Sequence, residues 1–132
     1  MNPKDVESFL REKEYLFGFL SINIDKIDNG TCIISFPWKE EFARLGNILH
    51  GGMIMSAMDY AGALAVLSVN DKRNQVTQEL KINFIDPMTK GPFKCVARVV
   101  KKGKSTAVVD VEFYDSEGKL GAKGLGTWFL LS

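Results

Sequence analysis

The most constraining feature of the sequence is a stretch of apolar and small residues from Gly51 to Val69 that contains a single charged residue, Asp59. Its length is borderline for a membrane span, but an aspartate at the bilayer centre would cost about 2.5–3.5 kcal/mol on insertion scales. Both flanks have the patterns of folded soluble structure. We therefore expect a buried helix that is apolar nearly all round and covered on most faces. Its small residues allow another backbone to approach closely.

Strands are expected on both sides of this helix, because apolar residues recur there with a period of two. A helix capped by Asn2 starts the chain, and Asp28-Asn29-Gly30 forms a hairpin turn. Residues 39–44 are expected to form one helical turn, and residues 45–52 a loop. The expected strands are Phe19–Ile27, Thr31–Phe36, Val76–Phe84, Phe93–Lys101, Ser105–Tyr114 and Leu120–Leu131.

Strands joined by short turns form antiparallel hairpins, so these elements predict an α+β fold with the sheet curled around the long helix. The chain has 132 residues, which suits one domain spanning residues 1–132. A single sheet leaves part of the helix and one sheet edge uncovered. We therefore expect at least a homodimer.

Composition narrows the classes of function. Lys and Arg total 17 against 16 Asp and Glu, so no overall field attracts nucleic acid or an anionic membrane. Two distant cysteines, Cys32 and Cys95, and a single histidine make a metal site improbable. Both cysteines are expected to be buried thiols, which suits the cytoplasm. The N-terminus is charged and lacks the apolar core of a secretory signal.

His50, Gly51 and Gly52 lie where a loop meets the long helix. Two glycines at a helix start leave backbone N–H groups bare, and these groups with the helix dipole favour an anion or a developing oxyanion. The alternative is that the glycines only permit a tight turn. His50 is expected to fix this loop by bonding a backbone carbonyl, rather than to act as a base.

Asp59 is the strongest candidate for a catalytic residue, because a carboxylate among apolar residues is costly to bury unless it is paired or takes part in catalysis. It is either a general base or nucleophile, or a structurally satisfied aspartate. Thr77 falls on the polar side of its strand by alternation, where it bonds a water or a carboxylate or is simply solvated. Lys101, Lys102 and Lys104 surround a hairpin turn and are either solvated or contact phosphate.

The spacing of Gly51 and Asp59 constrains any joint role. Eight residues on one helix separate them by about 12 Å along the axis. A base and an oxyanion site that serve one carbonyl must lie much closer together. Two such helices packed antiparallel across a two-fold axis would bring Gly51 of one chain near Asp59 of the other. A joint site would therefore be shared between subunits.

The segment Leu49–Gly52, with Asp59 nine residues after the histidine, resembles the hotdog-fold acyl-CoA thioesterases of the phenylacetate-degradation (PaaI-like) type. Residues 77–87 resemble the strand that follows the helix in that family, and residues 102–124 resemble its last hairpin. The resemblance implies a sheet wrapped around a central helix, in homodimers that often pair into homotetramers.

It also implies hydrolysis of an acyl-CoA thioester to a free acid and CoA, without metal or bound cofactor. The N–H of Gly51 would polarise the thioester carbonyl, and Asp59 of the neighbouring subunit would activate water or attack directly. Thr77 would help to hold the water. The basic residues expected at the CoA phosphates are Lys101, Lys102 and Lys104.

The loop before the helix departs from the family pattern. The family usually has Asn six residues before its histidine and Gly three before it, where this chain has Arg44 and Asn47. Arg44 replaces the usual amide donor, or a rearranged loop lets Asn47 serve. Substrate contacts are expected at Gly52 and Arg44. An apolar pocket is suggested by Met53, Met55, Met58, Phe84 and Trp128.

Two other functions remain open. A non-catalytic acyl-CoA-binding protein on the same scaffold would keep the phosphate contacts and lack the base, which Asp59 argues against. A hotdog hydratase or dehydratase would resemble sequences with a histidine followed shortly by proline, whereas His50 here precedes two glycines.

Overall fold

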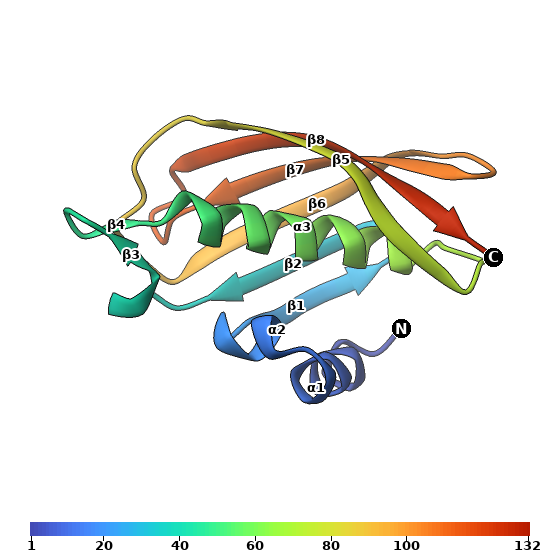
Figure 1. Cartoon of the computed structure of the whole chain (residues 1–132), viewed down its shortest axis with the longest axis horizontal. Helices are drawn as coiled ribbons and strands as arrows, with labels where there is room; N and C mark the ends of the chain where they lie inside the picture. Colours follow the sequence, from blue (N-terminus) through green and yellow to red (C-terminus); the bar gives the residue numbers. More distant parts are fainter.

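A computed structural model describes all residues, 1–132, and shows one sheet curled around one long helix (Figure 1). The six-stranded antiparallel sheet has the order β1-β2-β6-β7-β8-β5, and a separate two-stranded ribbon pairs β3 with β4. The elements are α1 Pro3–Lys13, α2 Tyr15–Phe19, β1 Asn23–Asp28, β2 Thr31–Phe36, η1 Glu40–Phe42, β3 Ala43–Arg44, β4 Ile48–Leu49, α3 Gly51–Leu67, β5 Asn74–Phe84, β6 Phe93–Lys102, β7 Thr106–Tyr114 and β8 Leu120–Leu131.

The expected α+β architecture is confirmed, with α3 lying in the concave face of the sheet (Figure 1). The long helix ends at Leu67, two residues earlier than predicted. One continuous core of 28 buried residues joins α3 to the inner face of the sheet. None of the helices combines the length and apolarity needed to cross a membrane.

Two sequence predictions were wrong in the part of the chain that precedes the long helix. The strand predicted from Phe19 begins only at Asn23, because Phe17 and Leu20 are fully buried at helical spacing and place Phe19 at the end of α2. Residues 45–52 are not a plain loop, since β3 and β4 pair across a tight turn. The predicted helical turn in residues 39–44 is a short 3₁₀ helix, Glu40–Phe42.

The two edges of the sheet differ. At β1, the N-terminal helix supplies the missing partner: Glu7 Oε1 accepts a 2.7 Å hydrogen bond from the N–H of Ile24, and Arg11 donates to the carbonyl of Ile22 at 2.8 Å. At the other edge, the eleven residues of β5 pair only with β8. Helix α1 therefore protects one edge, and β5 leaves the other free to pair with another strand.

Replacing Glu7 tests how α1 protects β1. Glu7 is 5% exposed, so Glu7→Ala leaves the N–H of Ile24 buried without its acceptor, at a cost of about 1–3 kcal/mol in the free energy of unfolding. Urea denaturation measures this loss. Glu7→Gln keeps a carbonyl acceptor and should lose less, and Glu12→Ala, at an exposed position of the same helix, should change little. Equal stability of all three variants would contradict this role.

Candidate active site

The N-terminus of α3 is fixed by His50, which is its N-cap residue. His50 Nδ1 accepts a 3.0 Å hydrogen bond from the N–H of Gly52, and its carbonyl accepts from Met53 and Ile54. The predicted bond from His50 to a backbone carbonyl was wrong, since the ring accepts from an N–H instead. The N–H of Gly51 has no acceptor within the chain and lies at the positive end of the helix dipole.

The loop before α3 brings Arg44 to this helix end. A pocket of about 340 Å³ is lined by Arg44 of β3 and Gly51 of α3, together with Phe84 at the end of β5. Asn47 is exposed at the β3–β4 turn with a φ of 58° and does not line this pocket. Of the two residues that depart from the family pattern, Arg44 is therefore the one beside Gly51.

Asp59 and Thr77 are joined by a short hydrogen bond between their side chains. Thr77 Oγ1 donates a 2.6 Å hydrogen bond to Asp59 Oδ1, joining the middle of α3 to β5. The other carboxylate oxygen makes no hydrogen bond or ion pair within the chain. Asp59 is half-buried rather than enclosed, because α3 is open to solvent on this side.

The predicted facing of Thr77 was wrong, because a β-bulge changes the alternation. Thr77 pairs with Trp128 and Glu79 pairs with Thr127, so Gln78 is an extra residue in β5. Directly paired residues share a face of the sheet, and Trp128 is buried in the core. Thr77 therefore faces α3 and not the polar side.

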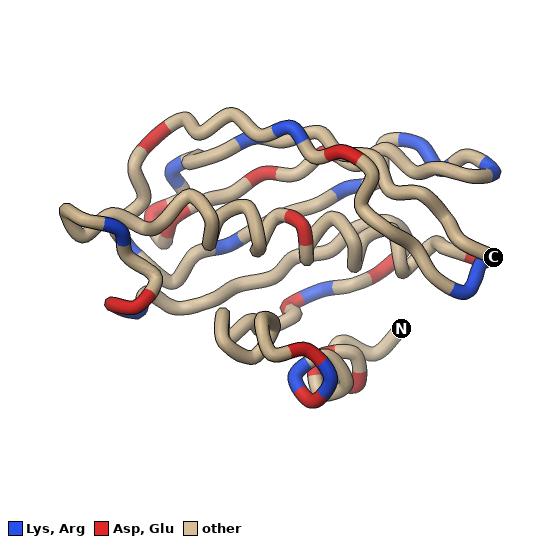
Figure 2. Tube along the Cα trace, in the orientation of Figure 1, with Lys and Arg blue, Asp and Glu red and all other residues tan.

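The uncovered side of α3 forms an open stripe, defined as Gly52, Met55, Ser56, Asp59, Ala63 and Leu67. All six are half-buried or exposed, and they recur at the three- and four-residue spacing of one helical face. Asp59 is the single charge in this stripe, and Figure 2 shows no other charged residue on α3. The helix is thus not covered on every face within one chain.

The basic turn between β6 and β7 lies at the other end of the molecule from the N-terminus of α3 (Figures 1 and 2). Lys102 forms a 3.5 Å ion pair with Asp71, whereas Lys101 and Lys104 form none. Seventeen residues of α3 extend about 25 Å, so these lysines and Gly51 of one chain lie far apart.

Other titratable groups are poor candidates for chemistry. Burial raises the pKa of the Cys32 thiol to about 12, with a further contribution from the charge of Asp25, and burial also raises the pKa of Cys95. Both predicted buried thiols are confirmed and stay protonated at neutral pH. Burial, followed by a hydrogen bond to Glu14, raises the pKa of Tyr60 above its usual range.

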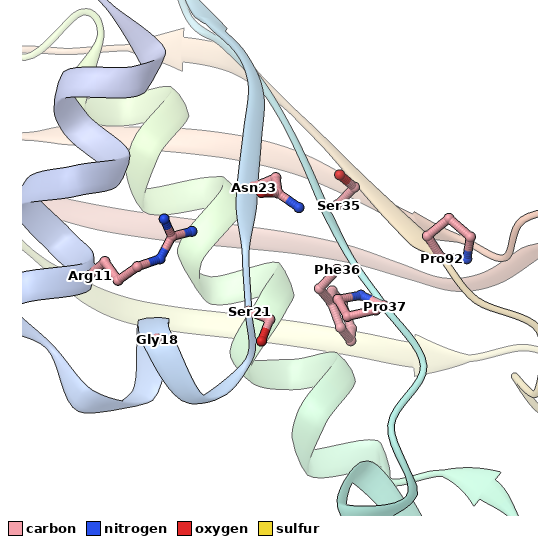
Figure 3. A pocket seen from close by; sticks show the side chains of 8 residues that line it. All are labelled: Arg11, Gly18, Ser21, Asn23, Ser35, Phe36, Pro37 and Pro92. Atoms are coloured by element: carbon pink, nitrogen blue, oxygen red, sulfur yellow. The ribbon is translucent and has the colours of Figure 1, made fainter.

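A larger pocket of about 490 Å³ lies between the N-terminal helices and the β1–β2 edge (Figure 3). Arg11, Ser21 and Asn23 line it, and none of the predicted site residues does. The apolar pocket predicted from Met53, Met55, Met58, Phe84 and Trp128 is only partly present. Phe84 lines the pocket beside Gly51, but Met58 and Trp128 are buried in the core.

Sequence reasoning missed several residues of the pocket beside Gly51. Ile85 and Met88 line it from the segment that follows β5, and Ile54 lines it from α3. The sequence offered no signal for Ile85 and Met88, because their place depends on the path of the chain after Phe84.

Comparison with known proteins gives one consistent family. Residues 46–122 match the family model described as "Thioesterase superfamily". A Saccharolobus solfataricus protein named "Putative esterase" is 48% identical over 97% of this chain and 91% of its own length. A Buchnera aphidicola protein named "Uncharacterized acyl-CoA thioester hydrolase" is 26% identical over 80% of this chain and 77% of its own length.

Among solved structures, the Escherichia coli PaaI protein from the phenylacetic acid degradation operon superposes with a TM-score of 0.87. It is 25% identical, and the match covers 95% of this chain and 90% of PaaI. The predicted hotdog fold and the resemblance to PaaI-like proteins are both confirmed.

Proposed function

Because this chain belongs to the thioesterase superfamily, a family of thioester hydrolases, we propose that it hydrolyses acyl-CoA thioesters at a site shared between two copies of the chain. The observation that carries the proposal is the pairing of Asp59 with Thr77 on the same helix whose first residue, Gly51, has a bare N–H. The name of the Buchnera relative supports CoA thioesters as the substrate class.

Gly51 supplies the electrophilic half of the site. Its N–H donates to the thioester carbonyl, and the bond strengthens as negative charge develops on that oxygen. Gly52 cannot replace it, because its N–H is already bonded to His50. The role of His50 is to hold the first turn of the helix so that the N–H of Gly51 points outward.

Asp59 supplies the other half as a general base. Its free carboxylate oxygen takes a proton from water, the resulting hydroxide adds to the carbonyl carbon, and the C–S bond breaks to release CoA as the thiol after protonation. The Thr77 hydroxyl donates its only hydrogen to Asp59. Its oxygen can still accept a hydrogen bond from the same water. This second contact favours activated water over direct attack by Asp59.

The two halves cannot meet within one chain, because about 12 Å of helix separates Gly51 from Asp59. Two features support a homodimer in which they meet. The β5 edge is free to pair with β5 of a second copy, and the open stripe of α3 contains Asp59, which Thr77 joins to this same edge strand. Antiparallel packing of two α3 helices then places Gly51 of each copy beside Asp59 of the other.

The same arrangement brings basic residues to the substrate. The second copy's β6–β7 turn lies beyond the C-terminal end of its α3, on the side where the first copy's Gly51 is found. We assign the CoA phosphates to Lys101, Lys102 and Lys104 of that turn. The apolar group of the thioester is assigned to the pocket beside Gly51, with Arg44 and Gly52 at its border.

The single core supports one domain over residues 1–132. Two free, buried thiols support a reducing compartment, and we propose the cytoplasm. Pairing of two dimers into a homotetramer is a further expectation from the PaaI-like resemblance.

Release of CoA thiol from a panel of acyl-CoAs tests the function. Wild-type protein should turn over at least one member, and Asp59→Asn should lose about 10²-fold or more in kcat because the base is removed. Asp25→Asn, at an exposed site on β1, is the matched control and should keep full activity. A wild-type protein that binds acyl-CoA without turnover would instead be a non-catalytic acyl-CoA-binding protein.

The role of Gly51 is tested by removing its N–H while keeping the helix. Proline is tolerated at the first helical position, and His50 already has the extended backbone, with a ψ of 134°, that a residue before proline requires. Gly51→Pro should lower kcat by about 10²–10³-fold. Gly51→Ala keeps the N–H, its added methyl meets only Phe84 at 3.6 Å, and it should retain most activity. Equal effects of the two variants would contradict an oxyanion role for this N–H.

A further inference from the structure

The largest fully buried side chain, Trp128, lies between α3 and the β5–β8 pair. A Cβ atom added at Gly62 would lie 2.3 Å from Trp128 Cη2, and one added at Gly126 would lie 2.6 Å from Cζ3. The two glycines therefore leave the space that the indole occupies. The small size of Gly62, which the sequence suggested for the approach of another backbone, serves an intramolecular contact.

This contact lies next to the Asp59–Thr77 pair. Gly62 is three residues after Asp59, so it lies about one turn further along α3, on the buried side next to the open stripe that carries Asp59. Thr77 is directly opposite Trp128 in the β5–β8 pairing, and the two side chains share the inner face of the sheet. The indole thus lies between Gly62, one turn after Asp59, and the part of the sheet that carries Thr77.

The indole is placed by packing alone. Trp128 Nε1 is buried and has no hydrogen-bond partner in the chain. No polar contact therefore fixes the ring, and its position depends on the fit against Gly62 and Gly126. A smaller ring would leave α3 free to move toward the sheet, because no hydrogen bond of the ring opposes that movement.

We propose that Trp128 is a positioning residue that sets the separation of α3 and β5 at which Thr77 donates to Asp59. This inference rests on the proposed function, because it assigns Trp128 a role through the Asp59–Thr77 pair. Trp128 itself touches neither substrate nor water. Gly62 and Gly126 serve the same role by admitting the ring.

A double-mutant cycle on acyl-CoA hydrolysis tests this coupling. Trp128→Phe should lower kcat by about tenfold with little change in KM, because misplacement of a catalytic group costs rate. In a Thr77→Val background, where the hydrogen bond is already absent, the same change should lower kcat by less than about twofold. A residue that only stabilises the fold would lower kcat by the same factor in both backgrounds.

Matched variants keep the test interpretable. Trp38→Phe removes the other tryptophan, which packs on Phe93, and should leave kcat unchanged. Gly62→Ala drives the intact indole from its place and should lower kcat, and adding Trp128→Phe to it should restore part of the loss by making room for the methyl group. If Trp128→Phe alone does not fold, this rescue decides the question, and its failure overturns the proposal.

The outcomes also distinguish failure of the proposed function from failure of the role assigned to Trp128. An inactive wild type, or a fully active Asp59→Asn, overturns the proposed function. An active wild type with an inactive Asp59→Asn, but with equal effects of Trp128→Phe in both backgrounds, overturns only the positioning role of Trp128.

Discussion

The whole structure depends on burying α3 against a sheet that covers it from one side. The apolar sequence of this helix draws β2, β5, β6, β7 and β8 around it and produces the curled sheet. The sheet cannot close, so one stripe of the helix and the β5 edge stay open. The two polar groups proposed to act on the substrate, Asp59 and the N–H of Gly51, both belong to this incompletely covered helix.

The two edge strands of the sheet, β1 and β5, differ in whether another element covers them. At β1, Glu7 and Arg11 bond the backbone groups that a neighbouring strand would otherwise bond. No such helix covers β5. The protection of one edge and the openness of the other, next to the candidate base, support the proposed homodimer with the site at its interface.

Much of the fold followed from the sequence alone. Period-two patterns placed Thr31–Phe36 and Leu120–Leu131 at the bounds that the structure has, because each strand alternates between core and solvent and ends at a turn. The face of Thr77 was missed, since an extra residue at Gln78 leaves no mark in the alternation of a polar strand. The start of β1 was missed because Leu20 continues the period-two alternation of Ile22 and Ile24, although it follows α2 and precedes the strand.

The sequence alone indicated which residues belong to the candidate site, but not how those residues contact one another. The sequence indicated Gly51 and Asp59, and helix geometry separated them, yet only the structure shows Thr77 bonded to Asp59 and Arg44 beside Gly51. The contact of Trp128 with Gly62 joins residues far apart in the chain, and no local pattern encodes it.

The most direct measurement of the shared site is subunit complementation. Gly51→Pro and Asp59→Asn chains, each inactive alone, are unfolded together, refolded as a 1:1 mixture and assayed for CoA release. If each site takes Gly51 from one copy and Asp59 from the other, half of the dimers are mixed and contain one intact site of two, which restores about a quarter of wild-type activity. If the mixture stays inactive although mixed dimers form, each site lies within one chain and the account is wrong.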